Sequence, residues 1–268
     1  MSEPTPQSQP VTEPKPKSQP IRRDFLFGAL AGGTAIGAGW LATKNADRAS
    51  HERATPCYSQ CGEDLIASML FKHIKIDKPT YIDIGAYRPV QSNNTYLFYL
   101  AGGHGVLVEP NVDLTAELKR ERPRDVTLPV GIGFSDKEEL MDYYRMEIAE
   151  WNTFDAEEAK RRVERTGGGV KILETVKVPL LPLNKVVAEH FGGKAPDFLS
   201  VDVEGLDLAI LKSLDFEKYR PKIICAEALV VLTNKMEPDI GDFLKTKGYA
   251  MRGMTFPNQI FVDEKVLN

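Results

Sequence analysis

Carboxylates follow three short apolar stretches of the sequence, at points where each stretch breaks into a loop. Asp83 lies in Tyr-Ile-Asp-Ile-Gly, Glu109 follows Gly-Val-Leu-Val, and Asp202 and Glu204 follow Phe-Leu-Ser-Val. Carboxylates can bind hydroxyl or cationic groups of a ligand, and a positioned carboxylate can remove a proton from a reacting hydroxyl. The first hypothesis is therefore a ligand-binding or catalytic site that is assembled from strand ends.

The first two stretches have the order expected of a nucleoside site. Gly85 lets the backbone approach a ligand closely, and Glu109 follows it by 24 residues, about one βαβ unit. An acidic residue at that position is placed to accept hydrogen bonds from both hydroxyls of a ribose. The full G-x-G-x-x-G pattern is absent, and Pro89 would disrupt a phosphate-binding helix start. The sequence therefore favours a nucleoside without a pyrophosphate over NAD.

Asp202 and Glu204 offer two interpretations. Side chains two residues apart on a strand share a face, so both carboxylates would point together if the strand continued through them. Glu204 would instead cap a helix starting near Asp207 if the strand ended earlier. We expect His104 to be a loop residue and His190 to be a structural residue.

Short β-branched stretches alternate with stretches of helical spacing from residue 54 onward. The expected strands are Tyr81–Ile84, Gly105–Glu109, Val126–Ile132, Asp197–Val203, Lys222–Ala228 and Gln259–Val262. The expected helices are Glu63–Ile74, Thr95–Leu100, Val112–Arg120, Leu183–Phe191, Asp207–Leu214 and Ile240–Lys247. This alternation predicts an α/β fold with a doubly wound, mainly parallel sheet, in which strand ends meet at one edge.

Residues 136–175, called the insertion segment below, break this alternation. The segment is charged, has helical spacing over Ala156–Arg165 and then contains Gly167-Gly168-Gly169. We expect it to be an insertion or a lid over the carboxyl edge of the sheet.

Five motifs that occur in order give the sequence a specific resemblance. They are Ser59-Gln60-x-Gly62-Glu63-Asp64, Tyr81–Tyr87, Ser92-Asn93-Asn94-Thr95-Tyr96, Val108-Glu109-Pro110-Asn111 and Ser200–Gly205. Over about residues 56–264 the chain resembles the FkbM-type S-adenosylmethionine-dependent methyltransferases. One departure is the second Asn in Ser-Asn-Asn-Thr, which leaves the alignment of Ser92 and Asn93 to the family pattern open.

The resemblance implies a Rossmann-like class I methyltransferase sheet with helices on both faces, and S-adenosyl-L-methionine as the cofactor. It implies that Asp83, Gly85 and Ala86 form a glycine loop around the methionine part of this cofactor. It further implies that Glu109 holds the ribose hydroxyls, with Pro110 and Asn111 beside the adenine.

The resemblance also implies O-methylation, often of sugar or polyketide hydroxyls, and therefore a small-molecule hydroxyl acceptor. Asp202 would face the reacting methyl group, and Glu204 and Glu227 would line the same edge. Methyl transfer is an in-line displacement that depends mainly on positioning, and a hydroxyl acceptor benefits from a base. We expect Asp202 to be that base, with Glu204 as the second candidate.

Composition excludes other classes of function. The chain has 268 residues and a net charge of −4, and the part after residue 55 holds 27 basic against 33 acidic residues. Nucleic-acid binding needs a basic face, so we expect no nucleic-acid partner. The mean hydropathy of −0.28 excludes a polytopic membrane protein. Three cysteines cannot form a disulfide framework, and we interpret them as plain thiols without a metal.

The first 54 residues differ from the rest of the chain. Residues 1–20 hold six of the eighteen prolines and are expected to be disordered. In residues 21–54, Arg22-Arg23 precedes the uncharged stretch Phe25–Ala42, which resembles a twin-arginine export signal. Eighteen residues with five glycines are barely long enough to span a bilayer. We expect membrane association through residues 25–42 or export, with the side of the membrane left open, and a methyltransferase domain over residues 55–268.

Two alternatives remain at this stage. A nucleotide-dependent oxidoreductase would need a phosphate-binding glycine helix, which Pro89 contradicts. A non-catalytic exported binding module would explain the leader, because S-adenosylmethionine is made in the cytosol, but the three carboxylate strand ends argue against lost activity. The sequence does not identify the acceptor, because acceptor pockets lie in variable loops.

Overall fold

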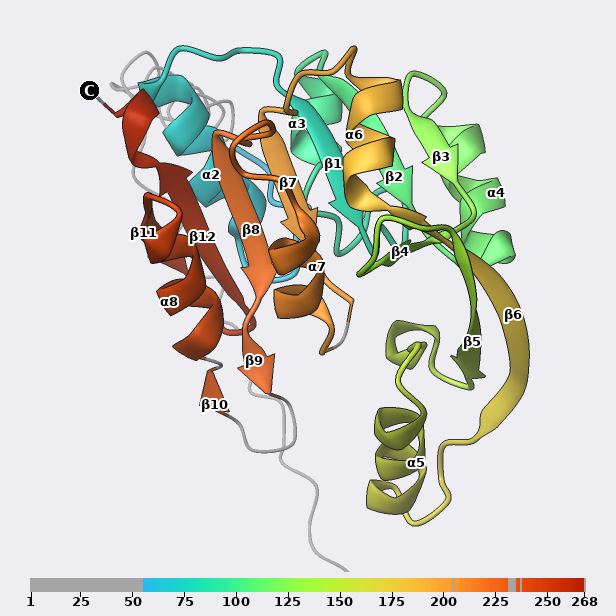
Figure 1. Cartoon of the computed structure of the whole chain (residues 1–268). Helices are drawn as coiled ribbons and strands as arrows, with labels where there is room; N and C mark the ends of the chain where they lie inside the picture. Colours follow the sequence, from blue (N-terminus) through green and yellow to red (C-terminus); the bar gives the residue numbers. More distant parts are fainter. Residues whose placement is uncertain (1–54, 204, 231–234, 237, 268) are drawn as a thin grey trace, which may run out of the picture. The chain divides into compact units, whose positions relative to one another are not determined.

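A seven-stranded sheet forms the centre of the computed structural model, which describes residues 55–203, 205–230, 235–236 and 238–267 (Figure 1). The strand order is β11-β12-β8-β7-β1-β2-β3. Five neighbouring strands, from β8 to β3, are parallel, whereas β12 is antiparallel to both β8 and β11. The strands are β1 Thr80–Ile84, β2 His104–Val108, β3 Val126–Leu128, β7 Phe198–Val201, β8 Ile223–Glu227, β11 Tyr249–Met254 and β12 Asn258–Asp263.

Helices cover both faces of this sheet because its buried strands are apolar on both sides. Ile82 and Ile84 of β1 pack into one core cluster with α6, α7 and α8, and Tyr81 packs into the other with α2, α3 and α4. The helices are α2 Glu63–His73, α3 Tyr96–Leu100, α4 Val112–Glu121, α6 Leu183–His190, α7 Asp207–Ser213 and α8 Pro238–Thr246. The predicted doubly wound, mainly parallel α/β fold is confirmed.

The chain order of the strands reverses direction at β1. The chain runs outward from β1 to β2 and β3, then returns to β7 on the other side of β1 and continues to β8. Such a reversal opens a crevice beyond the carboxyl ends of the two central strands, and ligands of open α/β sheets bind there. The loops after β1, β2, β7 and β8 are therefore the ones that can form a site.

Residues 131–182, which include the insertion segment, contain a second, three-stranded sheet, ordered β4-β6-β5. The elements of this region are β4 Gly131–Gly133, β5 Glu139–Met146, η1 Ala149–Trp151, α5 Ala156–Arg165 and β6 Ile172–Pro182, and Figure 1 shows β5 and β6 extending from β4 toward α5. The predicted helix over Ala156–Arg165 is confirmed, and the Asp155 side chain caps its first turn by accepting from Glu157 N and Glu158 N.

The sequence prediction was wrong in several places, among them β11, an edge strand that was not predicted, and His104, which was expected in a loop but begins β2. The single strand expected over Val126–Ile132 is two strands, β3 and β4, which lie in different sheets. Pro129 separates them, and proline has no amide hydrogen with which to continue a ladder. The long strands β5 and β6 were also not predicted; they pair mainly with each other, and most of their side chains are not buried.

Smaller elements complete the fold: β9 Leu229–Val230 pairs with β10 Lys235–Met236, and η2 spans Glu264–Val266. No helix among the described residues is long and apolar enough to cross a membrane. The predicted disordered tail over 1–20 and the predicted anchor over 25–42 lie outside the described residues.

Candidate active site

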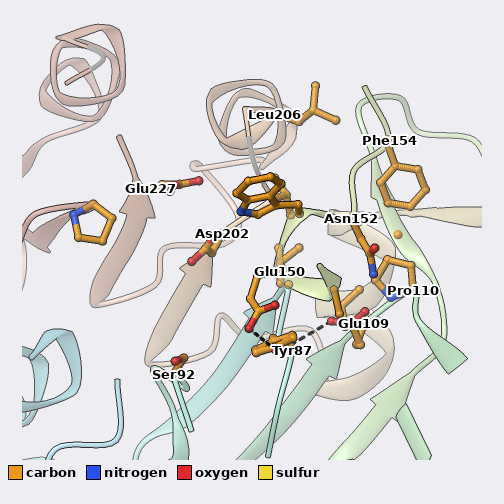
Figure 2. Close-up of a pocket in the computed structure, with 18 of the residues that line it drawn as sticks. Tyr87, Ser92, Glu109, Pro110, Glu150, Asn152, Phe154, Asp202, Leu206 and Glu227 are labelled. Atoms are coloured by element: carbon orange, nitrogen blue, oxygen red, sulfur yellow. Dashed lines mark hydrogen bonds between the residues drawn. The ribbon is translucent and has the colours of Figure 1, made fainter. Parts of the chain in front are cut away.

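A cavity of about 480 Å³ lies at the carboxyl ends of the central strands, bordered by the insertion segment (Figure 2). This volume is within the range of about 300–1,000 Å³ that is usual for small-molecule sites. The residues that line it and are discussed below are Gly85, Tyr87, Ser92, Asn94, Glu109, Pro110, Tyr143, Glu150, Trp151, Asn152, Phe154, Asp202, Leu206, Glu227 and Phe256.

Gly85 brings the ends of β1 and β7 together at the floor of the cavity. Its φ is +83°, and a Cβ atom there would lie 1.8 Å from the carbonyl oxygen of Asp202. The Asp202 amide donates to the Ile84 carbonyl oxygen at 3.0 Å, which holds the loop after β7 against this turn. No other residue type fits at position 85 without moving the Asp202 peptide.

Glu109 lies at the end of β2 with its carboxylate held by two backbone amides. Oε1 accepts from Asn111 N at 2.8 Å, and Oε2 accepts from Tyr87 N at 3.0 Å. The residue is 4% exposed, and none of the ion pairs found among the described residues includes it. Burial raises the pKa of Glu109 to about 7, although both amide hydrogen bonds oppose that shift.

The surroundings of Glu109 fit the nucleoside part of S-adenosylmethionine. Each carboxylate oxygen can accept a second hydrogen bond, and a ribose presents two neighbouring hydroxyl donors. The adjacent wall is apolar and aromatic, with the ring centroids of Tyr143 and Phe154 4.8 Å apart. Burial and the charge of Glu109 raise the pKa of the Tyr143 phenol, which therefore stays a neutral donor. An acceptor pair beside an aromatic wall suits a ribose that carries a base.

Five of the residues predicted for the site meet around the cavity: Gly85, Glu109, Pro110, Asp202 and Glu227. β7 ends at Val201, so Asp202 is in the following loop and the argument from a shared strand face does not apply. Glu204 lies outside the described residues.

Three other predicted residues lie behind the cavity wall. Asp83 is buried, and its Oδ2 accepts from Thr95 Oγ1 at 2.8 Å. The Ala86 carbonyl oxygen accepts from Asn93 Nδ2 at 3.0 Å. Asn111 caps α4 through Asp113 N and donates its own amide to Glu109. These residues shape the loops whose neighbours reach the cavity.

The cavity has two ends of different character. Figure 2 shows Glu109, Pro110 and Phe154 toward one end and Asp202 and Glu227 toward the other. Ser92 lies toward the second end in the same view, and Asn94, Leu206 and Phe256 also line the cavity. Two carboxylates at neighbouring strand ends can accept protons or hydrogen bonds from a ligand that binds there.

Sequence reasoning missed the residues that the insertion segment supplies. Tyr143, Glu150, Trp151, Asn152 and Phe154 all line the cavity. One signal was available, because a tryptophan in a charged stretch is unusual and the chain has only two. Tyr87, which directly follows the glycine turn, was also missed as a site residue in its own right.

The chain is similar in sequence to a known protein family. A family model described as the methyltransferase FkbM domain matches residues 83–251, which is more than half of the chain. No curated protein matches the sequence.

Several solved structures are similar at low sequence identity. An O-methyltransferase from Bacillus cereus in complex with SAH is 10% identical, with a TM-score of 0.38, over 85% of this chain and 89% of that chain. A 1,6-didemethyltoxoflavin-N1-methyltransferase from Burkholderia thailandensis is 10% identical, with a TM-score of 0.38, over 89% and 91%. A TehB-like SAM-dependent methyltransferase from Corynebacterium glutamicum is 9% identical, with a TM-score of 0.38, over 85% and 100%.

Proposed function

Because the chain belongs to the FkbM methyltransferase family and is an S-adenosylmethionine-dependent methyltransferase, we propose that it methylates a hydroxyl group of a small molecule. Membership of this family decides between the two enzyme classes that the sequence left open, in favour of methyl transfer. A sugar is the first acceptor class to test, because sugars present several hydroxyl groups close together.

The observation that carries the proposal is the division of one cavity between Glu109 and Asp202. Glu109 offers paired acceptor atoms beside an aromatic wall, and Asp202 lies beyond Gly85 at the switch point of the sheet. The cofactor, when bound, supplies a methyl group on a sulfonium that leaves as a neutral thioether. With its nucleoside at Glu109, the remaining end of the cavity is left for the acceptor.

Asp202 is our proposed general base, with Glu204 as the second candidate. A hydroxyl oxygen becomes a better nucleophile as its proton is taken, and a carboxylate within hydrogen-bond reach can take it. Glu227 lies toward the same end of the cavity and can hold another hydroxyl group of the acceptor. A methyl acceptor with many hydroxyl groups suits a cavity wall whose oxygen atoms can accept hydrogen bonds from them.

The test uses the purified full-length chain, S-adenosylmethionine with a labelled methyl group, and a panel of free sugars and small alcohols. Matched acceptors in which one hydroxyl is already methylated, and amines of similar size, serve as controls. We expect label in a hydroxyl-bearing acceptor and its loss when that hydroxyl is blocked. Label only in amines or thiols would contradict O-methylation while leaving the methyltransferase class intact.

We also propose that residues 25–42 associate the protein with a membrane. The support is the basic pair Arg22-Arg23, which only Asp24 separates from an uncharged stretch of eighteen residues. Supply of the cofactor favours a catalytic domain on the cytosolic side, whereas the twin-arginine resemblance favours export of a folded domain.

A further inference from the structure

A fully buried guanidinium lies behind the glycine turn, at the end of α4. Arg122 is 0% exposed and donates through Nε to Asp125 Oδ2 and through Nη1 to Asn93 Oδ1, both at 2.8 Å. Its Nη2 donates to the Tyr81 hydroxyl and to Thr95 Oγ1, both at 3.0 Å. A buried guanidinium needs partners for its donors, and these contacts fix its position between β1 and the loop that precedes α3.

The contact with Arg122 fixes the orientation of the Asn93 carboxamide. Its oxygen faces a donor that cannot lose its proton, so its nitrogen must face the other way. Asn93 Nδ2 donates to the carbonyl oxygens of Ala86 and Arg88, each at 3.0 Å. One amide therefore holds the carbonyl groups on both sides of Tyr87.

Tyr87 needs such support because its backbone has an unfavourable conformation. Its φ is +50°, in the left-handed region that residues other than glycine rarely adopt. In this conformation the Tyr87 amide donates to Glu109 Oε2 at 3.0 Å. If the peptides beside Tyr87 were released, the residue would relax and the amide would leave the carboxylate.

We propose that Arg122 and Asn93 are positioning residues for the cofactor site, acting through the Tyr87 amide on the carboxylate of Glu109. The series of contacts begins at the buried guanidinium of Arg122, which orients Asn93. Asn93 in turn holds two carbonyl groups of the loop, and the Tyr87 amide of that loop binds the Glu109 carboxylate. Neither residue lines the cavity. The inference rests on the proposed place of the cofactor at Glu109.

Two variants test the series at different points. Asn93→Asp keeps an acceptor for Arg122 but removes both donors to the loop carbonyls. Arg122→Lys keeps the charge but cannot reach four partners at once. Val187→Ala, which truncates a buried side chain of α6 in the other core cluster, is the control for loss of stability alone.

The first readout needs no ligand: hydrogen exchange of the Tyr87 amide in the full-length protein. We expect exchange to be on the order of tenfold faster in Asn93→Asp, because the loss of about two hydrogen bonds frees the loop. We expect a similar loss of affinity for S-adenosylhomocysteine by calorimetry, and a higher midpoint for the titration of Glu109 by carboxyl NMR. Val187→Ala should lower the melting temperature and leave all three unchanged.

The proposal would be overturned if the Asn93→Asp variant behaved like Val187→Ala. It would then be less stable than the wild type, but the exchange of the Tyr87 amide and the titration of Glu109 would be unchanged. Arg122→Lys checks the same readouts if Asn93→Asp does not fold. Absence of binding in the wild type would show that the cofactor placement is wrong. The exchange of the Tyr87 amide and the titration of Glu109 would still show whether Arg122 and Asn93 position the Tyr87 amide.

Discussion

The hydroxyl of Tyr87 donates a hydrogen bond to Glu150 Oε1 at 2.5 Å, joining the loop after β1 to η1 of the insertion segment (Figure 2). The Tyr87 hydroxyl also accepts from Arg88 Nε at 3.0 Å. Both Tyr87 and Glu150 line the cavity. The insertion segment is therefore fastened to the loop that the Tyr87 amide connects to Glu109.

Tyr87→Phe removes this fastening but keeps the backbone amide that binds Glu109. Because the bond is exposed, we expect a modest effect, on the order of threefold faster release of S-adenosylhomocysteine in stopped-flow measurements. Tyr144→Phe, which removes a hydroxyl from β5 of the same segment, should release the ligand at the wild-type rate. Equal rates for all three proteins would show that the bond does not control access.

The raised pKa of Glu109 predicts how stability depends on pH. With a pKa of about 7 when folded, against 4.5 as its ordinary value, Glu109 holds a proton between these pH values that the unfolded chain has lost. Stability of the ligand-free protein should therefore fall as pH rises from about 4.5 to 7, by up to ~3 kcal/mol from this group.

Glu109→Gln removes that contribution, because an amide does not titrate in this range. Burial also raises the pKa of Asp83, which gives a slope of the same sign in both proteins, so the informative quantity is their difference. Urea denaturation of both at pH 5 and pH 8 measures it. A wild type that loses no more stability than Glu109→Gln over this range would contradict the predicted titration.

Asp202→Asn tests the proposed base. We expect turnover to fall by roughly 10²–10⁴-fold, while the affinity for S-adenosylhomocysteine changes little, because the substitution keeps the size of the side chain. Glu227→Gln, at the next strand end, should mainly raise the KM for the acceptor. Near wild-type turnover in Asp202→Asn would make Asp202 a structural residue and Glu204 the candidate.

The leader is tested in cells. We expect wild-type protein in the membrane fraction or outside the cytoplasm, and an Arg22→Lys/Arg23→Lys double variant retained inside if the twin-arginine route is used. Wild type in the soluble cytosol would refute membrane association. Wild type in the membrane together with an unaffected double variant would support an anchor without that export route.

The parts of the site that follow from short stretches of sequence were predictable. Gly85 and Glu109 lie at the ends of apolar strands, and their separation of one βαβ unit places both at the same edge of the sheet. The alternation of strands and helices predicted that sheet because buried parallel strands are apolar throughout.

The rest depends on contacts between distant parts of the chain. Asp83 lies one residue before the end of β1 and Glu109 one residue after the end of β2, so both are close to a strand end. The Asp83 side chain nevertheless faces Thr95 and a buried network, and nothing near it in the sequence indicates that direction. Glu150 and Trp151 reach the cavity only because β5 and β6 pair with each other across more than twenty residues. Pairing of that kind leaves little trace in strands whose side chains are mostly not buried.

The most direct test of the account is a calorimetric titration of the full-length protein with S-adenosylhomocysteine, comparing wild type with Glu109→Ala and using NAD as a second ligand. We predict binding to the wild type, no binding of NAD, and a binding free energy in Glu109→Ala that is weaker by about 1–3 kcal/mol, because a charged hydrogen-bond acceptor is lost. Equal affinity in both proteins would contradict the placement of the cofactor at Glu109.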